Sequence, residues 1–491
     1  MNLTPDPTQN KWKTLDKDLA RLSQLENATA AISKPSFGIG VSVVFIVICG
    51  LVAFALSGGT PGSALIVTAA VFGAYMALNI GANDVANNMG PAVGANALTM
   101  GGALVIAAIC ETAGSLIAGG DVVSTISGGI VDPAAVAGPD IFIWAMMAAL
   151  IAASLWLNLA TWLGAPVSTT HAIVGGVMGA GIAAAGFEAV NWPKMSQIAA
   201  SWVISPLMGG FIAAAFLAFI KATINDVEDK ISAARKWVPI LIGIMVGAFA
   251  SYLAMKGLKK IVDISLGHAL FAGLVLGLAT TLVMRPIVRR QSEGLENRKK
   301  SLKKLFAVPL IASAALLSFA HGANDVANAV GPLAAIVHAV QDAGTASKVT
   351  IPYWVMLIGA FGISFGLMLF GPKLIRMVGS EITKLNPMRA YCVALSAAIT
   401  VIVASWLGLP VSSTHIAVGA VFGVGFYREW HADRKFRAQN ILKGTPVSPE
   451  ERSRRKLVRR AHVLGIGAAW VVTVPLTAVL SALIFMVLRL F

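Results

Sequence analysis

The sequence is poor in charge and in cysteine. Only 12% of its 491 residues are charged, about half the share that is usual in soluble proteins, which excludes a soluble enzyme or a soluble DNA-binding domain. Its three cysteines, Cys49, Cys110 and Cys392, lie in apolar runs and have the spacing of neither a disulfide framework nor a metal site. Because the polar residues 1–36 are too many for the n-region of a secretory signal, no cleavable signal is expected.

Long apolar runs are abundant instead. Thirteen runs approach the roughly 20 residues that a transmembrane helix needs. They lie at 37–57, 63–86, 101–119, 141–162, 167–186, 198–220, 237–254, 267–284, 305–337, 352–371, 390–408, 411–427 and 461–488. We therefore predict an all-α, polytopic membrane protein with about 12 core segments and one extra N-terminal helix. Since the junctions after 162 and 408 are short, the pairs 141–186 and 390–427 are each either two spans or one re-entrant hairpin.

The positions of Lys and Arg predict the orientation. Alternate loops at 1–36, 221–236, 285–304, 373–389 and 428–460 hold 32 of the 38 basic residues, and the opposite set holds six. Because cytoplasmic loops carry the excess of Lys and Arg, we expect a cytoplasmic N-terminus and a C-terminus outside the cell (inner) membrane. The net charge of +15 thus reflects insertion in the lipid bilayer and indicates no nucleic-acid partner.

Two motifs occur twice, in the same order. GANDVANNMGP at 81–91 returns as GANDVANAVGP at 322–332, and PVSTTHAIVGGVMGAG at 166–181 returns as PVSSTHIAVGAVFGVG at 410–425. The two copies of the first motif are seven membrane segments apart. Because each segment reverses the direction of the chain across the membrane, an odd number of segments inserts the second half upside down relative to the first. Such inverted repeats are the architecture of many secondary transporters, whose substrate binds near the midplane where the repeats meet.

This organisation predicts five parts. They are a cytoplasmic tail at 1–36, an extra transmembrane helix at 37–57, a first repeat at 63–220, connecting helices and basic loops at 221–304, and a second repeat at 305–490 that includes the basic loop 428–460. In the tail, Trp12, Leu15 and Leu19 recur at helical spacing. This fits an amphipathic helix on the membrane surface, a helix packed on a neighbouring chain, or a disordered segment.

Three acids, Asp84, Glu111 and Asp325, lie inside apolar segments. A carboxylate there is costly and usually marks an ion or proton pathway. The two aspartates take the same place in the two copies of the first motif, and they are flanked by amides at Asn83, Asn87, Asn324 and Asn328. Such oxygens suit a small hard cation, so we predict a Na⁺ or H⁺ site in each half, with Asn87 and Asn328 on the substrate side. A buried Asp–Asn network that only joins helices is the alternative.

Glycine and proline bracket each of these motifs, at Gly81 and Gly90-Pro91 and again at Gly322 and Gly331-Pro332. This bracketing predicts that each motif helix is broken, which would free backbone carbonyls to complete a cation shell.

The second motif predicts an anion site. Its proline suits the first turn of a helix, and a helix N-terminus inside the membrane has unpaired donors and a partial positive charge. The hydroxyls that would bind the anion are Ser168, Thr169 and Thr170 in one half and Ser412, Ser413 and Thr414 in the other. With inverted repeats, two such helix ends can converge on one oxyanion. Ordinary helix capping is the alternative.

Three histidines adjoin these motifs. His171 and His415 end the second motif in the two halves, and a structural hydrogen bond is favoured for them over a proton relay. His321 lies four residues before Asp325, but Ile80 takes its place in the first half. A symmetric metal site is therefore not expected, and we predict that His321 supports the ligands of the site without binding the ion itself.

Glu111 has no counterpart in the second half. We assign it to the cation path, and a buried partner is the alternative. No enzyme is expected, because neighbouring residues in Ser-Thr-Thr-His do not face each other on a helix and no acid nearby would orient the histidine.

The duplicated GANDVAN and PVS[ST]TH motifs resemble those of the inorganic phosphate transporter (PiT) family, over about residues 63–490. The resemblance implies a carrier that symports phosphate with Na⁺ or H⁺, has no further cofactor and forms a homodimer. It also implies that the motif Asn and Asp residues line the cavity and that the Ser and Thr residues cradle phosphate. Residues 1–57 depart from the family core.

The sequence thus predicts a secondary transporter that imports inorganic phosphate by cation symport and alternating access. Cations would neutralise Asp84 and Asp325, phosphate would dock on the paired helix ends, and the repeats would rock. A carrier of sulfate or another tetrahedral oxyanion is the first alternative, and an anion channel is the second.

Overall fold

A computed structural model describes residues 35–59, 61–163, 167–257, 262–342, 351–377, 385–443 and 460–490. Helix α2 (Pro35–Ser57) precedes the first half, which comprises α3 (Ser63–Gly94), α4 (Met100–Ala118), α5 (Gly120–Ser124), α6 (Pro139–Leu163), α7 (Thr169–Ala185) and α8 (Trp192–Ile220). The connecting helices are α9 (Lys230–Lys256), α10 (Leu266–Gln291) and α11 (Leu302–Leu305). The second half comprises α12 (Ala307–Asp325), α13 (Ala327–Asp342), α14 (Tyr353–Met377), α15 (Pro387–Trp406), α16 (Ser413–Lys443) and α18 (Arg460–Leu488). Short 3₁₀ or π turns occur at Thr125–Gly129, Pro133–Ala135, Phe187–Ala189 and Lys221–Asn225.

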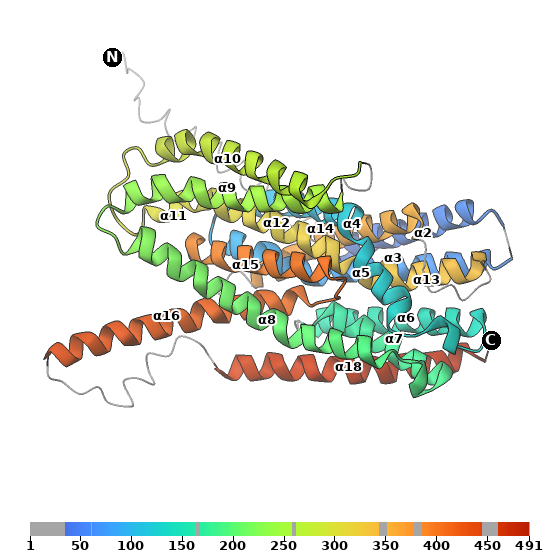
Figure 1. Ribbon diagram of the computed structural model, residues 1–491. Helices are drawn as coiled ribbons and strands as arrows, with labels where there is room; N and C mark the ends of the chain where they lie inside the picture. Colours follow the sequence, from blue (N-terminus) through green and yellow to red (C-terminus); the bar gives the residue numbers. More distant parts are fainter. Residues whose placement is uncertain are drawn as a thin grey trace, which may run out of the picture.

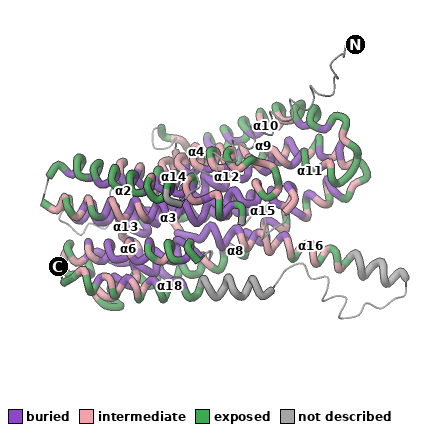
Figure 2. Tube along the Cα trace, turned by 180° about the vertical axis from the view of Figure 1, so that it is seen from behind, coloured by how far each residue is buried: buried purple, intermediate pink, exposed green. Residues whose placement is uncertain are grey.

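The predicted all-α membrane class is confirmed. Eleven helices in the described part of the chain are long and apolar enough to cross a membrane, and every predicted apolar run contains a helix. Figure 2 shows the buried residues gathered around α3, α12 and α13, whereas the outer helices α2 and α10 are largely exposed. Their exposed residues include Val43, Leu51, Leu270 and Leu274, as expected for faces that contact lipid. Residues 1–34 of the tail predicted at 1–36 and residues 444–459 of the basic loop lie outside the described residues.

The two short-junction pairs are hairpins that enter from opposite ends. In Figure 1, α6 and α7 occupy one end of the bundle and α15 and α16 the other, and the tips of the two hairpins meet between them. At the tips, Thr170 Oγ1 donates to the Val411 carbonyl at 2.9 Å. The centroids of the His171 and His415 rings lie 4.4 Å apart. Of the two alternatives, the structure therefore favours the re-entrant one for both pairs.

Glycines place the two motif helices against helices of the opposite half. A Cβ on Gly81 of α3 would lie 1.9 Å from the carbonyl oxygen of Ile363 in α14. A Cβ on Gly322 of α12 would lie 2.2 Å from the carbonyl oxygen of Glu111 in α4. Only glycine permits such an approach, so α3 packs on α14 and α12 packs on α4.

The same contacts recur from the other side. A Cβ on Gly366 of α14 would lie 2.1 Å from the Leu78 carbonyl oxygen, and one on Gly114 of α4 would lie 2.0 Å from that of Phe319. Leu78 and Phe319 are equivalent positions of the two motif helices, so Gly366 and Gly114 are equivalent as well. The contacts therefore make α4 and α14 counterparts, as two related halves require.

The hairpins also pack on helices of the opposite half. A Cβ on Gly179 of α7 would lie 2.1 Å from the carbonyl oxygen of Ala478 in α18. A Cβ on Gly423 of α16 would lie 2.0 Å from that of Gly210 in α8. Each half therefore contributes a hairpin to a contact that the other half completes.

We predict that Gly366→Ala destabilises the protein, because the added methyl group meets backbone that no side-chain rotation can move. The expected loss is about 1–3 kcal/mol, seen as a lower unfolding temperature of the purified protein in detergent. Gly101→Ala is the matched control, since a Cβ at this site on α4 meets nothing within 4 Å. Equal unfolding temperatures for the two variants would contradict this account of the packing.

The expected break in both motif helices is wrong for the first half. Helix α3 runs without interruption through the first motif to Gly94, beyond the expected end at 86. Gly81 serves close packing there, and Pro91 removes only the N–H that would reach the carbonyl of Asn87, four residues earlier. In the second half α12 ends at Asp325 and α13 begins at Ala327. Val326 between them keeps helical dihedral angles and still bonds to the backbone of Gly322 and Val330, so the interruption is only one residue long and frees no carbonyl at this position.

Candidate functional site

The candidate site lies where the two hairpin tips meet α3 and α12. Its three acids, Asp84, Glu111 and Asp325, are all buried. Buried carboxylates need partners of opposite charge or several hydrogen bonds, so the contacts of each acid indicate what the site can bind.

Asp84 on α3 accepts a hydrogen bond from each hairpin tip. Its Oδ2 accepts from Thr169 Oγ1 at 2.9 Å, and its Oδ1 accepts from Thr414 Oγ1 at 3.1 Å. The amide of Asn87, one turn further along α3, donates to Thr414 Oγ1 at 2.8 Å. The carboxylate thus joins hydroxyls from both halves.

Asp325 at the end of α12 has the equivalent arrangement. Its Oδ2 accepts from Ser413 Oγ at 2.8 Å, and its Oδ1 lies 3.5 Å from Thr170 Oγ1. Asn328 donates to the oxygens of Thr170 and Thr169 at 3.2 and 3.3 Å. The two aspartates and four hydroxyls therefore form one network with approximate twofold symmetry, which brings the predicted cation and anion sites together.

The first hydroxyl of each trio has a different role. Ser168 Oγ accepts the backbone N–H of His171 at 3.1 Å, and Ser412 Oγ accepts that of His415 at 3.3 Å. These two serines are N-caps, as the capping alternative proposed. The remaining hydroxyls of the two trios are those that face the carboxylates.

The outer asparagines of the motif hold the tips in place. Asn83 donates to the Val167 carbonyl at 3.2 Å. Asn324 donates to the Leu409 carbonyl and accepts the backbone N–H of Val411, both at 3.2 Å. Their amides therefore bind hairpin backbone, and a direct role for them in cation binding stays a prediction.

The paired histidines pack between the tips. The ring of His171 lies edge-on to His415 and 3.9 Å from that of Trp202. Trp202 Nε1 in turn donates to the Pro410 carbonyl at 3.1 Å. These contacts fit a structural role for the two histidines.

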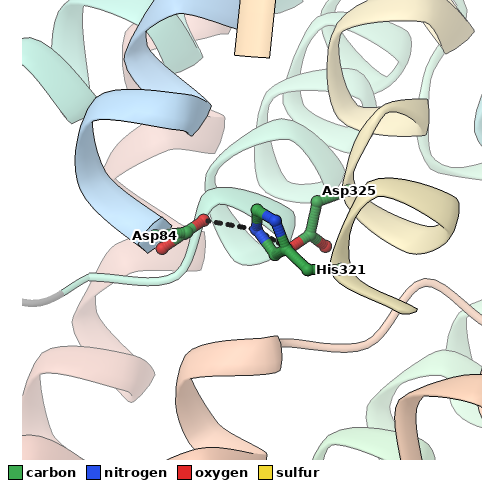
Figure 3. A group of neighbouring side chains, drawn as sticks. All are labelled: Asp84, His321 and Asp325. Atoms are coloured by element: carbon green, nitrogen blue, oxygen red, sulfur yellow. Dashed lines mark ion pairs between the residues drawn. The ribbon is translucent and has the colours of Figure 1, made fainter. Parts of the chain in front are cut away.

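His321 is more central than its spacing indicates. Its Nε2 lies 2.7 Å from Asp325 Oδ2 and 3.8 Å from Asp84 Oδ2, and Figure 3 shows the imidazole between the two carboxylates. One ligand atom from each of these residues lies within 4.8 Å of the others. The three side chains could therefore hold a cation, although the sequence spacing placed His321 behind the ligands.

Glu111 connects to this centre through His321. Its Oε1 lies 3.2 Å from His321 Nδ1 and accepts from Asn88 Nδ2 at 3.0 Å. Glu111 thus has buried partners, as the alternative for it proposed, and its role in the cation path stays a prediction. The contact with Asn88 was missed from the sequence, because nothing in the motif separates Asn88 from its neighbours.

The polar group formed by His321, Glu111 and Asn88 has no polar equivalent at the symmetry-related position. By the equivalences above, the counterparts of His321, Glu111 and Asn88 are Ile80, Ile363 and Ala329. All three counterparts are buried and apolar. The site is therefore symmetric in its aspartates and hydroxyls and asymmetric in the groups behind them.

Some oxygens of the site remain available to a ligand. Glu111 Oε2 and Asn328 Oδ1 are buried and have no hydrogen-bond partner within the described residues. Buried polar atoms are normally satisfied, and carboxylate and amide oxygens are ligands of hard cations. The ligand atoms present therefore fit a small cation.

Comparisons with known proteins agree with this chemistry. The sequence model of a family described as "Phosphate transporter family" matches residues 80–481. A protein of Helicobacter pylori (strain J99) named "Putative phosphate permease" is 46% identical, over 96% of this chain and 98% of the relative. A Pyrococcus abyssi protein of the same descriptive name is 36% identical, over 85% of this chain and 96% of the relative. A solved structure described as "The sodium-dependent phosphate transporter" is 35% identical and superposes with a TM-score of 0.78, over 87% of this chain and all of that one.

Proposed function

This chain belongs to the phosphate transporter family, and we propose that it imports inorganic phosphate by cation symport, with alternating access to the site between the hairpin tips. Its family supports phosphate as the substrate and a carrier as the class of protein. Na⁺ is the first candidate for the coupling ion, because the similar solved structure is that of a transporter described as sodium-dependent. H⁺ is the second.

One observation carries the proposal of symport: the hydroxyls that would bind the anion donate to the aspartates. Thr169 donates to Asp84 and Ser413 donates to Asp325. A hydroxyl has a single proton to donate, so neither can donate to a carboxylate and to phosphate at once. A cation on each carboxylate replaces the lost donor and leaves the hydroxyl for the anion. Cation and anion therefore each favour the binding of the other.

Charge supports the same order of events. A phosphate anion beside Asp84, Asp325 and Glu111 is repelled, and burial strengthens the repulsion because the interior screens charge weakly. A cation at each of the two aspartates neutralises two of these three charges and so removes most of that repulsion. The site should therefore reorient readily when it is loaded with both ions and poorly with one.

The test is uptake of labelled phosphate into proteoliposomes under an imposed Na⁺ or H⁺ gradient. With one of the two gradients, we expect phosphate to accumulate above its external concentration. With no gradient, we expect phosphate only to equilibrate slowly. Uptake that is indifferent to both gradients would overturn symport, and uptake that only follows the phosphate gradient would indicate a channel. Unlabelled sulfate should compete weakly, and strong competition across pH would favour a general oxyanion carrier.

Three further features complete the proposal. The basic ends of α9, α10 and α16 share one end of the bundle (Figure 1), and we place that end in the cytoplasm with the C-terminus outside. Membership of the phosphate transporter family supports a carrier and not an enzyme. The resemblance to the family supports a homodimer, which chemical cross-linking in native membranes would test.

A further inference from the structure

A polar cavity lies at the end of the bundle from which α15 and α16 enter. It has a volume of about 190 Å³ and lies between the C-terminal end of α8, α11, the start of α15 and the middle of α16. Among the described residues, its lining includes five basic side chains and no carboxylate; the five are Lys221, Lys299, Lys303, Arg389 and Arg428. No residue of the central site lines it.

The two arginines of this lining have no carboxylate partner in the described part of the chain. Lys299 has Asp226 at 3.7 Å. Arg389 Nε donates to the neutral amide oxygen of Asn386 at 2.9 Å, and neither Arg389 nor Arg428 forms an ion pair with a described carboxylate. Burial lowers the pKa of the Arg428 guanidinium, as expected for a cation that burial desolvates without a compensating partner.

The first half of the chain shows that the fold does not require these charges. The two hairpins align without a gap, and this alignment pairs Arg389 with Ala145 and Arg428 with Ala184. In the first hairpin, Ala145 is buried in an apolar cluster with Phe485 of α18, and Ala184 packs against the same cluster. The same place in the architecture is therefore packed with apolar residues in one half and is a basic cavity in the other.

We propose that this cavity binds a phosphate group, either inorganic phosphate from solution or the headgroup of an anionic phospholipid. Guanidinium and ammonium groups are the side chains that bind phosphate oxygens best. A water molecule takes about 30 Å³, so the cavity has room for a tetrahedral oxyanion with some of its water. The N-terminal end of α15 forms part of the wall and adds a partial positive charge. This inference is independent of the coupling ion at the central site.

The experiment measures how fast phenylglyoxal modifies each arginine, with the modified peptides counted by mass spectrometry. The full chain is reconstituted in nanodiscs of phosphatidylcholine, with or without phosphatidylglycerol, and with inorganic phosphate or with chloride at equal ionic strength. The central network contains no arginine, so binding there leaves this readout unchanged. With a ligand at about ten times its dissociation constant, Arg389 and Arg428 should react about tenfold more slowly.

The two sources give different outcomes. Protection by inorganic phosphate in pure phosphatidylcholine identifies the free anion, and protection that needs phosphatidylglycerol identifies the lipid headgroup. Arg289 and Arg290 on α10, both exposed, are the internal control and should react equally in all conditions. Equal protection of all four arginines would show general screening and would overturn the proposal, as would protection of none.

A second measurement covers the case in which the two arginines are too enclosed to react. Arg389→Gln combined with Arg428→Gln should lose one bound labelled phosphate in phosphatidylcholine nanodiscs, or one phosphatidylglycerol retained in native mass spectrometry. Arg289→Gln combined with Arg290→Gln removes the same charge and should lose neither. If the first pair also loses neither, no phosphate group binds in the cavity.

Discussion

Asp84→Asn and Asp325→Asn should each abolish cation-driven phosphate uptake. Asp84 accepts hydroxyl donors from both hairpin tips. Asp325 accepts one from Ser413 and lies 2.7 Å from His321 Nε2, and each carboxylate is the proposed ligand of a coupling cation. The amide of asparagine is neutral and turns donors toward those hydroxyls. At about 1.5–3 kcal/mol for each charge-assisted bond, the loss of two predicts a fall in coupled uptake of about 100-fold or more.

Proteoliposome uptake under the effective gradient measures this fall. Asp140→Asn is the matched control, because Asp140 is an exposed acid at the start of α6 and its variant should transport normally. The unfolding temperature of each variant separates a loss of coupling from a loss of folded protein. A folded Asp84→Asn protein that retains full coupled uptake would remove the aspartates from the mechanism.

Thr169→Val and Ser413→Ala should raise the KM for phosphate, and by similar factors. The two hydroxyls are counterparts, at 2.9 and 2.8 Å from their respective aspartates. Each substitution removes a donor proposed for the anion, at a cost of about 1–3 kcal/mol, or about 5- to 150-fold in affinity. Initial rates of uptake against phosphate concentration give the KM, with the cation kept in excess.

The capping serines provide the contrast. Ser412→Ala removes a hydroxyl that accepts a backbone N–H and does not face a carboxylate. It should therefore lower stability, by about 1 kcal/mol, and leave the KM for phosphate nearly unchanged. If Ser412→Ala and Ser413→Ala had the same effect on the KM, the division of the hydroxyls into two roles would be wrong.

The sequence predicted the fold class and the two motifs of the site well, because both depend on local patterns. A run of apolar residues determines a membrane helix by itself, and two copies of one motif reveal a repeat. The hairpin alternative also followed from the short junctions alone. The contacts between the tips, of Thr170 with Val411 and of His171 with His415, decided between spanning and re-entrant pairs.

Contacts between distant helices could not be predicted in this way. His321 shares a helical face with Asp325, but its distance to Asp84 depends on how α12 packs beside α3. The glycines of the motif were equally misleading, because glycine permits both a broken helix and a close contact. In α3 the approach of Gly81 to Ile363 shows that this glycine serves a close contact between helices. Each copy of the second motif contains both a capping hydroxyl, such as that of Ser168, and hydroxyls that face the carboxylates, such as that of Ser413 in the other copy. Only the direction of each side chain in the structure distinguishes the two roles.

The exchange of glycine contacts between the halves bears on which parts can move as rigid bodies. Helix α3 is packed on α14 and α12 on α4, whereas α7 is packed on α18 and α16 on α8. Separating the two sequence halves would open all four of these backbone contacts together. A transport cycle can preserve them if one body comprises α3, α4, α12 and α14 and the other comprises the hairpins with α8 and α18. Each moving body is then built equally from both halves of the chain, and the aspartates and hydroxyls lie on opposite sides of the surface along which the bodies slide.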